Sequence, residues 1–171
     1  DATGATAATE EKELFRELAE DISLALAGIE AEKKRRQAEE NEMASAERYR
    51  QTLDCMLEGV QIIGFDWRYL YLNDAACKHA RRARDELIGR TMMESYPGIG
   101  ETKLFTFLRQ CKEKRMPQHL ENEFSYPDGV KGWFELSVAP VPEGICILSI
   151  DITENKNIEE HLIVKERLAS I

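Results

Sequence analysis

The sequence predicts an α+β fold: a five-stranded antiparallel sheet with its helices on one face, flanked along the chain by a long helix on each side. Short strand-like segments bounded by Gly, Pro, Asn and Asp occur only between about residues 48 and 153. The strands come as two, then helices, then three, which is the order of an antiparallel sheet with segregated helices. Outside this region Glu, Ala, Leu, Lys and Arg dominate, which favours helix.

We therefore expect three parts in the chain. Residues 1–47 form an N-terminal signalling helix with a charged coiled-coil linker, residues 48–153 form the α+β domain, and residues 154–171 begin a C-terminal output helix. The chain starts at Asp1 and stops in helical composition without a capping glycine. We expect it to be a segment of a longer protein.

The first helix, expected from Glu10 onward, carries a heptad frame. Residues spaced by seven fall into two series, which are the a and d positions of one frame. They are apolar at both ends and polar in the middle, where Arg36, Glu32 and Glu39 interrupt the seam. This pattern predicts a homodimeric coiled coil, and the alternative is a helix that packs on its own domain and frays into a charged linker. The expected dimer seam contains Phe15, Leu18, Ile22, Ala25, Ile29, Met43, Ala46 and Leu53.

The first half of the domain reads as a hairpin followed by helices. Residues 59–65 and 68–72 are β-rich and are separated by Asp66 and Trp67. Asn73 and Asp74 are expected to cap a short helix. A further helical turn at residues 84–88, a loop at residues 97–100 and an amphipathic helix at residues 101–114 follow.

The second half reads as three strands. Residues 119–126 alternate, with Leu120, Asn122 and Phe124 on one side. A Pro-Asp-Gly turn leads to a second strand at residues 131–138, and residues 140–144 are expected to form the next turn. Residues 146–150 are almost wholly apolar, which is typical of a central strand packed on both faces.

Charge and cysteine content exclude several classes of function. A net charge of -9 argues against nucleic-acid binding, because DNA and RNA binders present a basic face. No apolar run is long enough to span a bilayer, so we expect no membrane contact within this segment. The four cysteines form no CxxC pair and the three histidines have no ligand spacing to them, which predicts reduced thiols, a cytoplasmic protein and no metal site.

Several segments together resemble a PAS domain over about residues 48–156. The opening half is carried by Glu58-Gly59-Val60, Asp66, the run from Tyr71 to Ala76, and Glu86-Leu87-Ile88-Gly89-Arg90. The closing half is carried by residues 126–156, which include Asp151-Ile152-Thr153 before the last helix. Residues 10–30 resemble the last helix of a GAF domain. The resemblance implies a bacterial or archaeal histidine kinase as parent, with a cyclic-dinucleotide enzyme as the alternative, and no enzyme activity in this fragment. It also implies a sensor domain upstream and an output domain downstream in the parent.

The PAS resemblance also implies a space for a ligand between the sheet and the long helix. Haem is disfavoured because residues 101–114 lack the His or Met ligand, and flavin because Cys77 and Cys111 lack the surrounding motif. No cofactor is expected; an unidentified apolar small molecule is one alternative, and a core filled by side chains is the other. The residues expected around such a pocket are Val60, Ile62, Leu72, Phe105, Leu108, Phe124, Leu136 and Ile147.

The expected function is signal relay between the flanking helices of a parallel homodimer. Asp151 is expected to anchor the end of the last strand, and Thr153 to cap the helix that follows. Movement of the sheet would then become rotation of the helix. The alternative is a PAS dimer that senses nothing and only assembles its parent. No group of residues suggests catalysis: Glu121, Glu123 and Glu135 read as a solvated sheet face.

Overall fold

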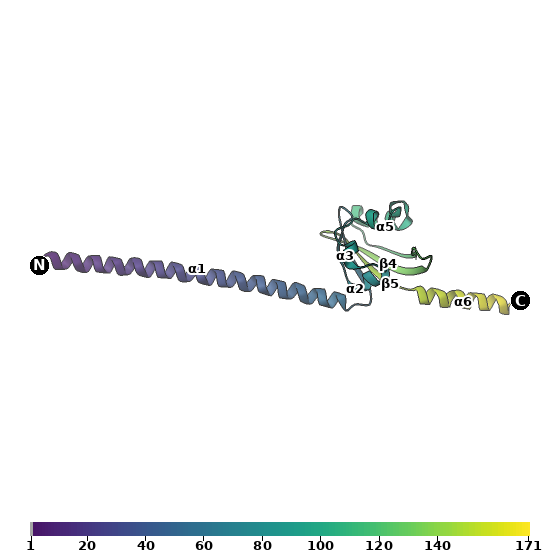
Figure 1. Cartoon of the computed structure of the whole chain (residues 1–171), viewed down its shortest axis with the longest axis horizontal. Coiled ribbons are helices and arrows are strands. Elements are labelled where there is room, and N and C mark those ends of the chain that lie inside the picture. Colours follow the sequence, from purple (N-terminus) through teal and green to yellow (C-terminus); the bar gives the residue numbers. More distant parts are fainter. Residues whose placement is uncertain (1) are drawn as a thin grey trace. The chain divides into compact units, whose positions relative to one another are not determined.

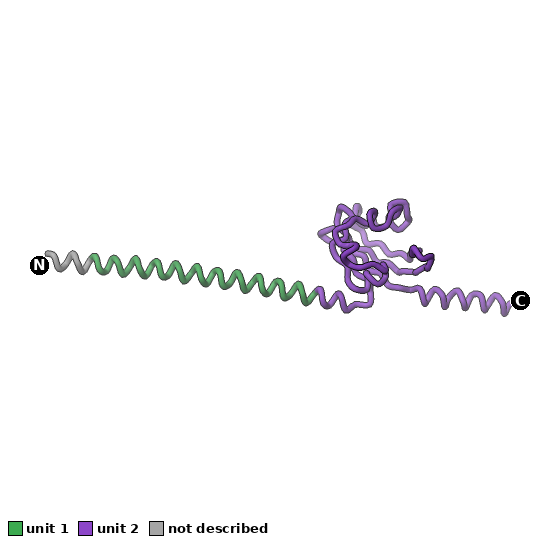
Figure 2. The backbone as a smooth tube through the Cα atoms, viewed as in Figure 1, with its two compact units in different colours: residues 1–49 green, residues 50–171 purple. Residues whose placement is uncertain are grey.

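The computed structural model describes the backbone of residues 2–171 and the side chains of residues 10–171. The chain divides into two units, residues 1–49 and residues 50–171 (Figure 2). The first unit is wholly helical within its described residues, and the second contains the sheet.

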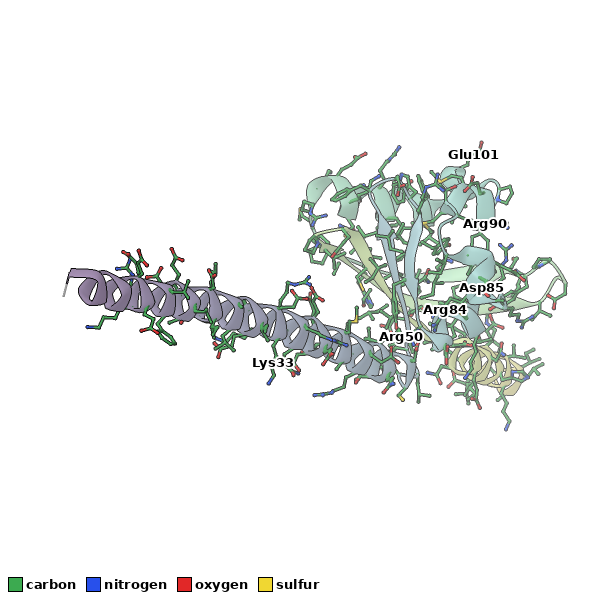
Figure 3. The ribbon with its side chains drawn as sticks, turned by 60° about the vertical axis from the view of Figure 1, so that its left-hand side comes forward. Lys33, Arg50, Arg84, Asp85, Arg90 and Glu101 are labelled. Atoms are coloured by element: carbon green, nitrogen blue, oxygen red, sulfur yellow. The ribbon has the colours of Figure 1, made fainter. Side chains whose placement is uncertain are left out.

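Helix α1 spans Ala2–Asp54, so it starts before the expected Glu10 and continues through Gly28. Its charged middle is stabilised by ion pairs within the helix. Arg35 lies 2.6 Å from Glu32 and 2.9 Å from Glu39, one turn away on either side. Each such pair contributes about 0.3–0.5 kcal/mol. Side chains such as Lys33 point into solvent (Figure 3), so these local pairs, and not burial, favour the helix there.

Five strands form one antiparallel sheet in the order β2-β1-β5-β4-β3, which confirms the predicted fold class (Figure 1). The central strand is β5, and it pairs directly with β1 although the sequence separates the two by most of the domain. The strands are β1 (Gly59–Gly64), β2 (Tyr69–Leu72), β3 (Gln118–Ser125), β4 (Lys131–Val141) and β5 (Gly144–Asp151).

The helices between β2 and β3 are short except for the last one. Helix η1 overlaps the loop expected at residues 97–100. Helix α4 lies in a stretch for which the sequence predicted no element, and it begins with a capping box between Thr91 and Glu94. Helix α6 follows β5 directly. The helical segments are α2 (Asp74–Ala80), α3 (Arg84–Leu87), α4 (Met92–Ser95), η1 (Ile99–Glu101), α5 (Lys103–Lys114) and α6 (Thr153–Ala169).

Strand β4 is longer than expected, because it continues through Pro140 to Val141. The turn expected at residues 140–144 is present but shorter, because only Pro142 and Glu143 separate β4 from β5. Proline is tolerated because β3 pairs with β4 only as far as Val138, so that Pro140 lies on a locally open edge.

The core lies between one face of the sheet and the helices α2–α5. Ile63, Leu87 and Leu108 are fully buried there, and burial of such side chains contributes about 1.5–3 kcal/mol each. The opposite face of the sheet is more open. Leu148 and Ile150 on β5 are 39% and 44% exposed, so the prediction that this strand packs on both faces is wrong for the single chain.

Candidate functional site

A cavity of about 100 Å³ lies between the inner face of the sheet and the helices that cover it. Its walls come from all five strands and from α2, α3, α4, η1 and α5. A cavity needs only about 10–15 Å³ of such volume to hold one water molecule, so this one has room for several. Side chains therefore do not fill the core completely, but the space that they leave is small.

Five of the eight expected pocket residues line this cavity: Leu72, Leu108, Phe124, Leu136 and Ile147. The other three do not. Val60 and Ile62 lie on the outer face of β1, because the side chains that alternate with them, Gln61 and Ile63, point inward.

Phe105 is buried but stacks on Trp67, with ring centroids 4.4 Å apart, away from the cavity. On α5 the cavity is lined by Leu104 and Leu108 instead.

Besides the phenols of Tyr69 and Tyr96, four polar side chains that the sequence did not assign to the pocket line the cavity, so its wall is not wholly apolar as expected. Gln61 lies on β1, His79 on α2, Asn122 on β3 and Ser149 on β5. Two of these residues could have been found from the sequence, because each is polar at a position where the strand pattern expects an apolar side chain. Ser149 interrupts an apolar run, and Asn122 falls on the apolar side of its strand. Acidic residues, lysines and arginines are absent from this wall among the described residues.

His79 and Ser149 form a hydrogen-bonded pair in the cavity wall. The His79 Nδ1 lies 3.0 Å from the Ser149 Oγ, and the Ser149 hydroxyl also lies 3.4 Å from the carbonyl oxygen of Gly59. The imidazole ring packs against Phe134 at 5.2 Å between centroids. Burial lowers the pKa of His79, and the nearby Asp151 carboxylate opposes this only in part, which favours a neutral ring.

The C-terminal end of α1 is attached to the domain by Asn73, whose side chain is completely buried. Its Nδ2 donates to the carbonyl oxygens of Leu53, at 2.8 Å, and Glu58, at 2.9 Å. Its Oδ1 accepts from the backbone amides of Val60 and Ala76. The bond from Ala76 makes Asn73 the N-cap of α2, as expected. One side chain thus joins α1, β1 and α2.

Arg84 of α3 adds an ion pair to the same attachment (Figure 3). Its guanidinium donates to Asp54 Oδ1 at the end of α1 and to Asp74 Oδ1 at the start of α2, both at 2.9 Å. The Tyr71 hydroxyl lies 3.4 Å from the same Asp54 oxygen. We call Asp54, Asn73 and Arg84 the input joint.

The end of β5 is tied to β4 by Asp151 and Thr153. The Asp151 carboxylate accepts from the Thr153 amide at 2.9 Å and from its hydroxyl at 2.5 Å. The Thr153 hydroxyl accepts in turn from the Trp133 amide on β4 at 2.9 Å. The expectation that Thr153 caps α6 is wrong: Ile152 is the N-cap and has no side-chain cap, because the Thr153 hydroxyl is engaged with Trp133 and Asp151.

Lys156, in the first turn of α6, reaches back to the outer face of the sheet. Its Nζ lies 2.7 Å from Glu121 Oε2 on β3 and 5.5 Å from the centre of the Trp133 ring. The carboxylates expected on a solvated sheet face are thus paired, since Glu123 also contacts Lys131 at 2.7 Å. We call Asp151, Thr153 and Lys156, with their partner Trp133, the output joint.

Comparison with known proteins decides the family: the family model described as PAS fold matches residues 53–157. The chain belongs to the PAS family. A search of curated proteins found no significant match.

Solved PAS structures share this fold at low sequence identity. A PAS domain from Colwellia psychrerythraea is 14% identical, over 64% of this chain and 98% of that one, with a TM-score of 0.54. The PAS domain of Bordetella pertussis BvgS is 22% identical, over 75% of this chain and 98% of that one, with a TM-score of 0.52. A PAS domain from a two-component sensor histidine kinase is 16% identical, over 64% and 98%, with a TM-score of 0.50.

The expected dimer seam lies on α1, ahead of the PAS domain. Its members are exposed in the single chain, from 52% for Ile22 to 74% for Met43, except for Leu53. Leu53 is half-buried because the helix end meets the PAS domain there.

Other chemistry has little support in the part of the chain that the structure describes. Its His, Cys, Asp and Glu side chains form no cluster that could hold a metal ion. Burial raises the pKa of the Cys77 thiol, with Arg84 opposing, so this cysteine is not activated. None of the described helices combines the length and apolar character needed to cross a membrane.

Proposed function

We propose that the chain is the sensory and signal-relay PAS module of a signal-transduction protein. In this proposal the parent is a cytoplasmic histidine kinase, α1 continues from a GAF-like domain, and α6 leads to the output domain. The fold similarity to a PAS domain from a two-component sensor histidine kinase supports this class of parent. The module has no catalytic role of its own and biases the parent through its helices.

One observation carries the proposal: both joints are attached to the paired strands β1 and β5 at the same end of their ladder. Gly59, the first residue of β1, pairs with Ser149, two residues before the Asp151 of the output joint. The carbonyl of Glu58, next to Gly59, is held by Asn73 of the input joint. A shift of β1 against β5 would therefore change both joints together.

The cavity provides a place where a signal could enter this path. Its His79–Ser149 pair lies beside Gly59, so a molecule that moves this pair acts on the ladder between the joints. Its volume of about 100 Å³ is smaller than that of an engineered cavity of about 150 Å³ that binds benzene, so a small molecule suits it in its present form.

The homodimer is proposed from the heptad frame and the exposure of its apolar members. Phe15 and Ile29 remain 72% and 64% exposed in one chain, which favours a second copy of the helix as their partner. A parallel arrangement would place two output helices side by side.

The relay can be tested by removing the output joint. In the double variant Asp151→Ala with Thr153→Ala, we expect the amides of Ile152 and Lys156 to exchange with solvent about tenfold faster, while the sheet stays folded. The matched control is Asp85→Ala with Thr106→Ala, two exposed residues of the same types. Unchanged exchange in α6 would reject the joint and leave an assembly module in its place.

A further inference from the structure

The cavity wall contains hydrogen-bonding groups that the described residues leave unused. The carboxamides of Gln61 and Asn122 face the cavity, and no described residue lies within hydrogen-bonding distance of either one. They lie on β1 and β3, so β5 and β4 separate them in the sheet. The stability of the fold does not require these two carboxamides. An apolar side chain of similar size would fill the same position and would bury no unpaired polar group.

Both carboxamides are half-buried, so water satisfies their hydrogen-bonding groups when no ligand is present. A molecule that displaces ordered water without replacing its hydrogen bonds loses affinity. An occupant that binds well must therefore carry a hydrogen-bonding group of its own. Carboxamides both donate and accept, so a hydroxyl or a carbonyl group is suitable.

The wall also restricts the charge of the occupant. It has aliphatic and aromatic side chains, carboxamides, hydroxyls and the imidazole of His79, but no carboxylate, ammonium or guanidinium. An ionised ligand would lose its hydration without gaining a counter-charge, which is strongly unfavourable. Uncharged ligands avoid this cost.

The available volume limits the size. The cavity of about 100 Å³ takes a few heavy atoms as it stands, and it takes one ring if side chains move slightly. Met92 in the wall can make room, because an unbranched side chain with three rotatable bonds repacks easily.

We propose that the cavity binds an uncharged molecule, no larger than a single ring, that carries a hydroxyl or carbonyl group. Gln61 and Asn122 supply hydrogen bonds from two separate strands on the same face of the sheet. The His79–Ser149 pair supplies a third polar contact, beside the first residue of β1. This proposal names the class of ligand for the proposed sensory function, and its biological meaning rests on that function. Ligand binding can nevertheless be measured whether or not the two helices are coupled.

The test uses phenol as the probe, with benzene and benzoate as ring-sized comparators, on the full chain observed by NMR. We expect phenol to shift resonances of cavity residues such as Leu136 and Ile147. Benzene, which lacks the hydroxyl, is expected to bind about tenfold more weakly, and benzoate more than a hundredfold more weakly. Equal affinities for phenol and benzene, tighter binding of benzoate, or no shift with phenol would each overturn the proposal.

Two near-isosteric variants separate a ligand-binding role from a structural one. Gln61→Met and Asn122→Leu are each expected to raise the thermal midpoint of the ligand-free protein by a few degrees, since they remove an unused polar group. Each is also expected to weaken phenol binding five- to tenfold. The control Asn155→Leu, on the exposed side of α6, should change neither. A variant that loses stability and keeps its phenol affinity would show that the carboxamide is structural and would overturn the proposal.

If phenol binds as expected while the double alanine variant of the output joint leaves α6 unchanged, the ligand class holds and the relay fails. The opposite pattern rejects the ligand class and keeps the relay.

Discussion

Among single residues, Asn73 connects the largest number of segments. The sequence identifies it as the cap of α2, because Asn is a preferred N-cap residue. Its bonds to Leu53 and Glu58 reach 20 and 15 residues back along the chain, and local propensity does not predict them. A buried amide with all its bonds made specifies one arrangement of the segments around it.

His79 makes the stability of the domain depend on pH. Burial holds its folded-state pKa below the ordinary value of 6.5, so that between these two values the unfolded chain binds more protons than the folded one. Stability contributed by the neutral ring is complete above 6.5 and is lost as the pH falls towards the folded-state pKa. The groups around the ring are Ser149, Phe134 and the Asp151 carboxylate, which only partly opposes the shift.

We therefore expect the free energy of unfolding to decrease between about pH 8 and pH 5 more steeply in the unmodified chain than in His79→Gln. Chemical denaturation at several pH values measures the difference. The control His161→Gln replaces an exposed histidine on α6 and should leave the slope unchanged. Parallel curves for the unmodified chain and His79→Gln would contradict this prediction.

Sequence reasoning was partly right about the pocket, and the error has a definite cause. In β1 the apolar residues Val60, Ile62 and Ile63 fall on both faces, so the pattern favours placing Gln61 outside. The structure places Gln61 inside. Reading a strand by hydrophobic alternation assumes that every inward side chain is apolar. That assumption fails for a polar residue in a cavity wall, and such failures are expected at functional sites.

At the scale of elements, α1 keeps its helical conformation without burying one face of its charged middle. Its local ion pairs were readable from sequence, since Arg35 follows Glu32 by three residues and precedes Glu39 by four. The short helices α4 and η1 were not predicted, because segments of three or four residues carry too little periodicity. The capping residues Thr91 and Glu94 were the available signal.

The heptad frame can be tested with two substitutions on the same helix. Ile22→Asp places a charge at an a position of the proposed seam, and we expect it to weaken dimerisation at least a hundredfold. Leu24→Asp changes a more exposed apolar residue two positions away, outside the a and d series, and should change the dimer dissociation constant less than threefold. Sedimentation equilibrium measures both. Equal effects, or a monomer before any substitution, would reject the coiled coil.

For the whole molecule, the order of strands and helices could be predicted because turns and alternation are local signals. The pairing of β1 with β5 was not predicted, because no local pattern links two strands so far apart in the sequence. That pairing brings the two ends of the domain together, so the input and output joints could not be located as neighbours from sequence alone. The account depends on this arrangement, since it is what would let one helix influence the other.

The most direct measurement is hydrogen exchange at the output joint after a change at the input joint. In Arg84→Ala, which removes the ion pair with Asp54, we expect the amides of Ile152 and Lys156 to exchange five- to tenfold faster relative to amides in the β3–β4 pairing. The control Arg90→Ala changes an exposed arginine outside the joint and should leave this ratio within twofold. If Arg84→Ala also leaves the ratio unchanged, the two joints are not coupled and the relay account is wrong.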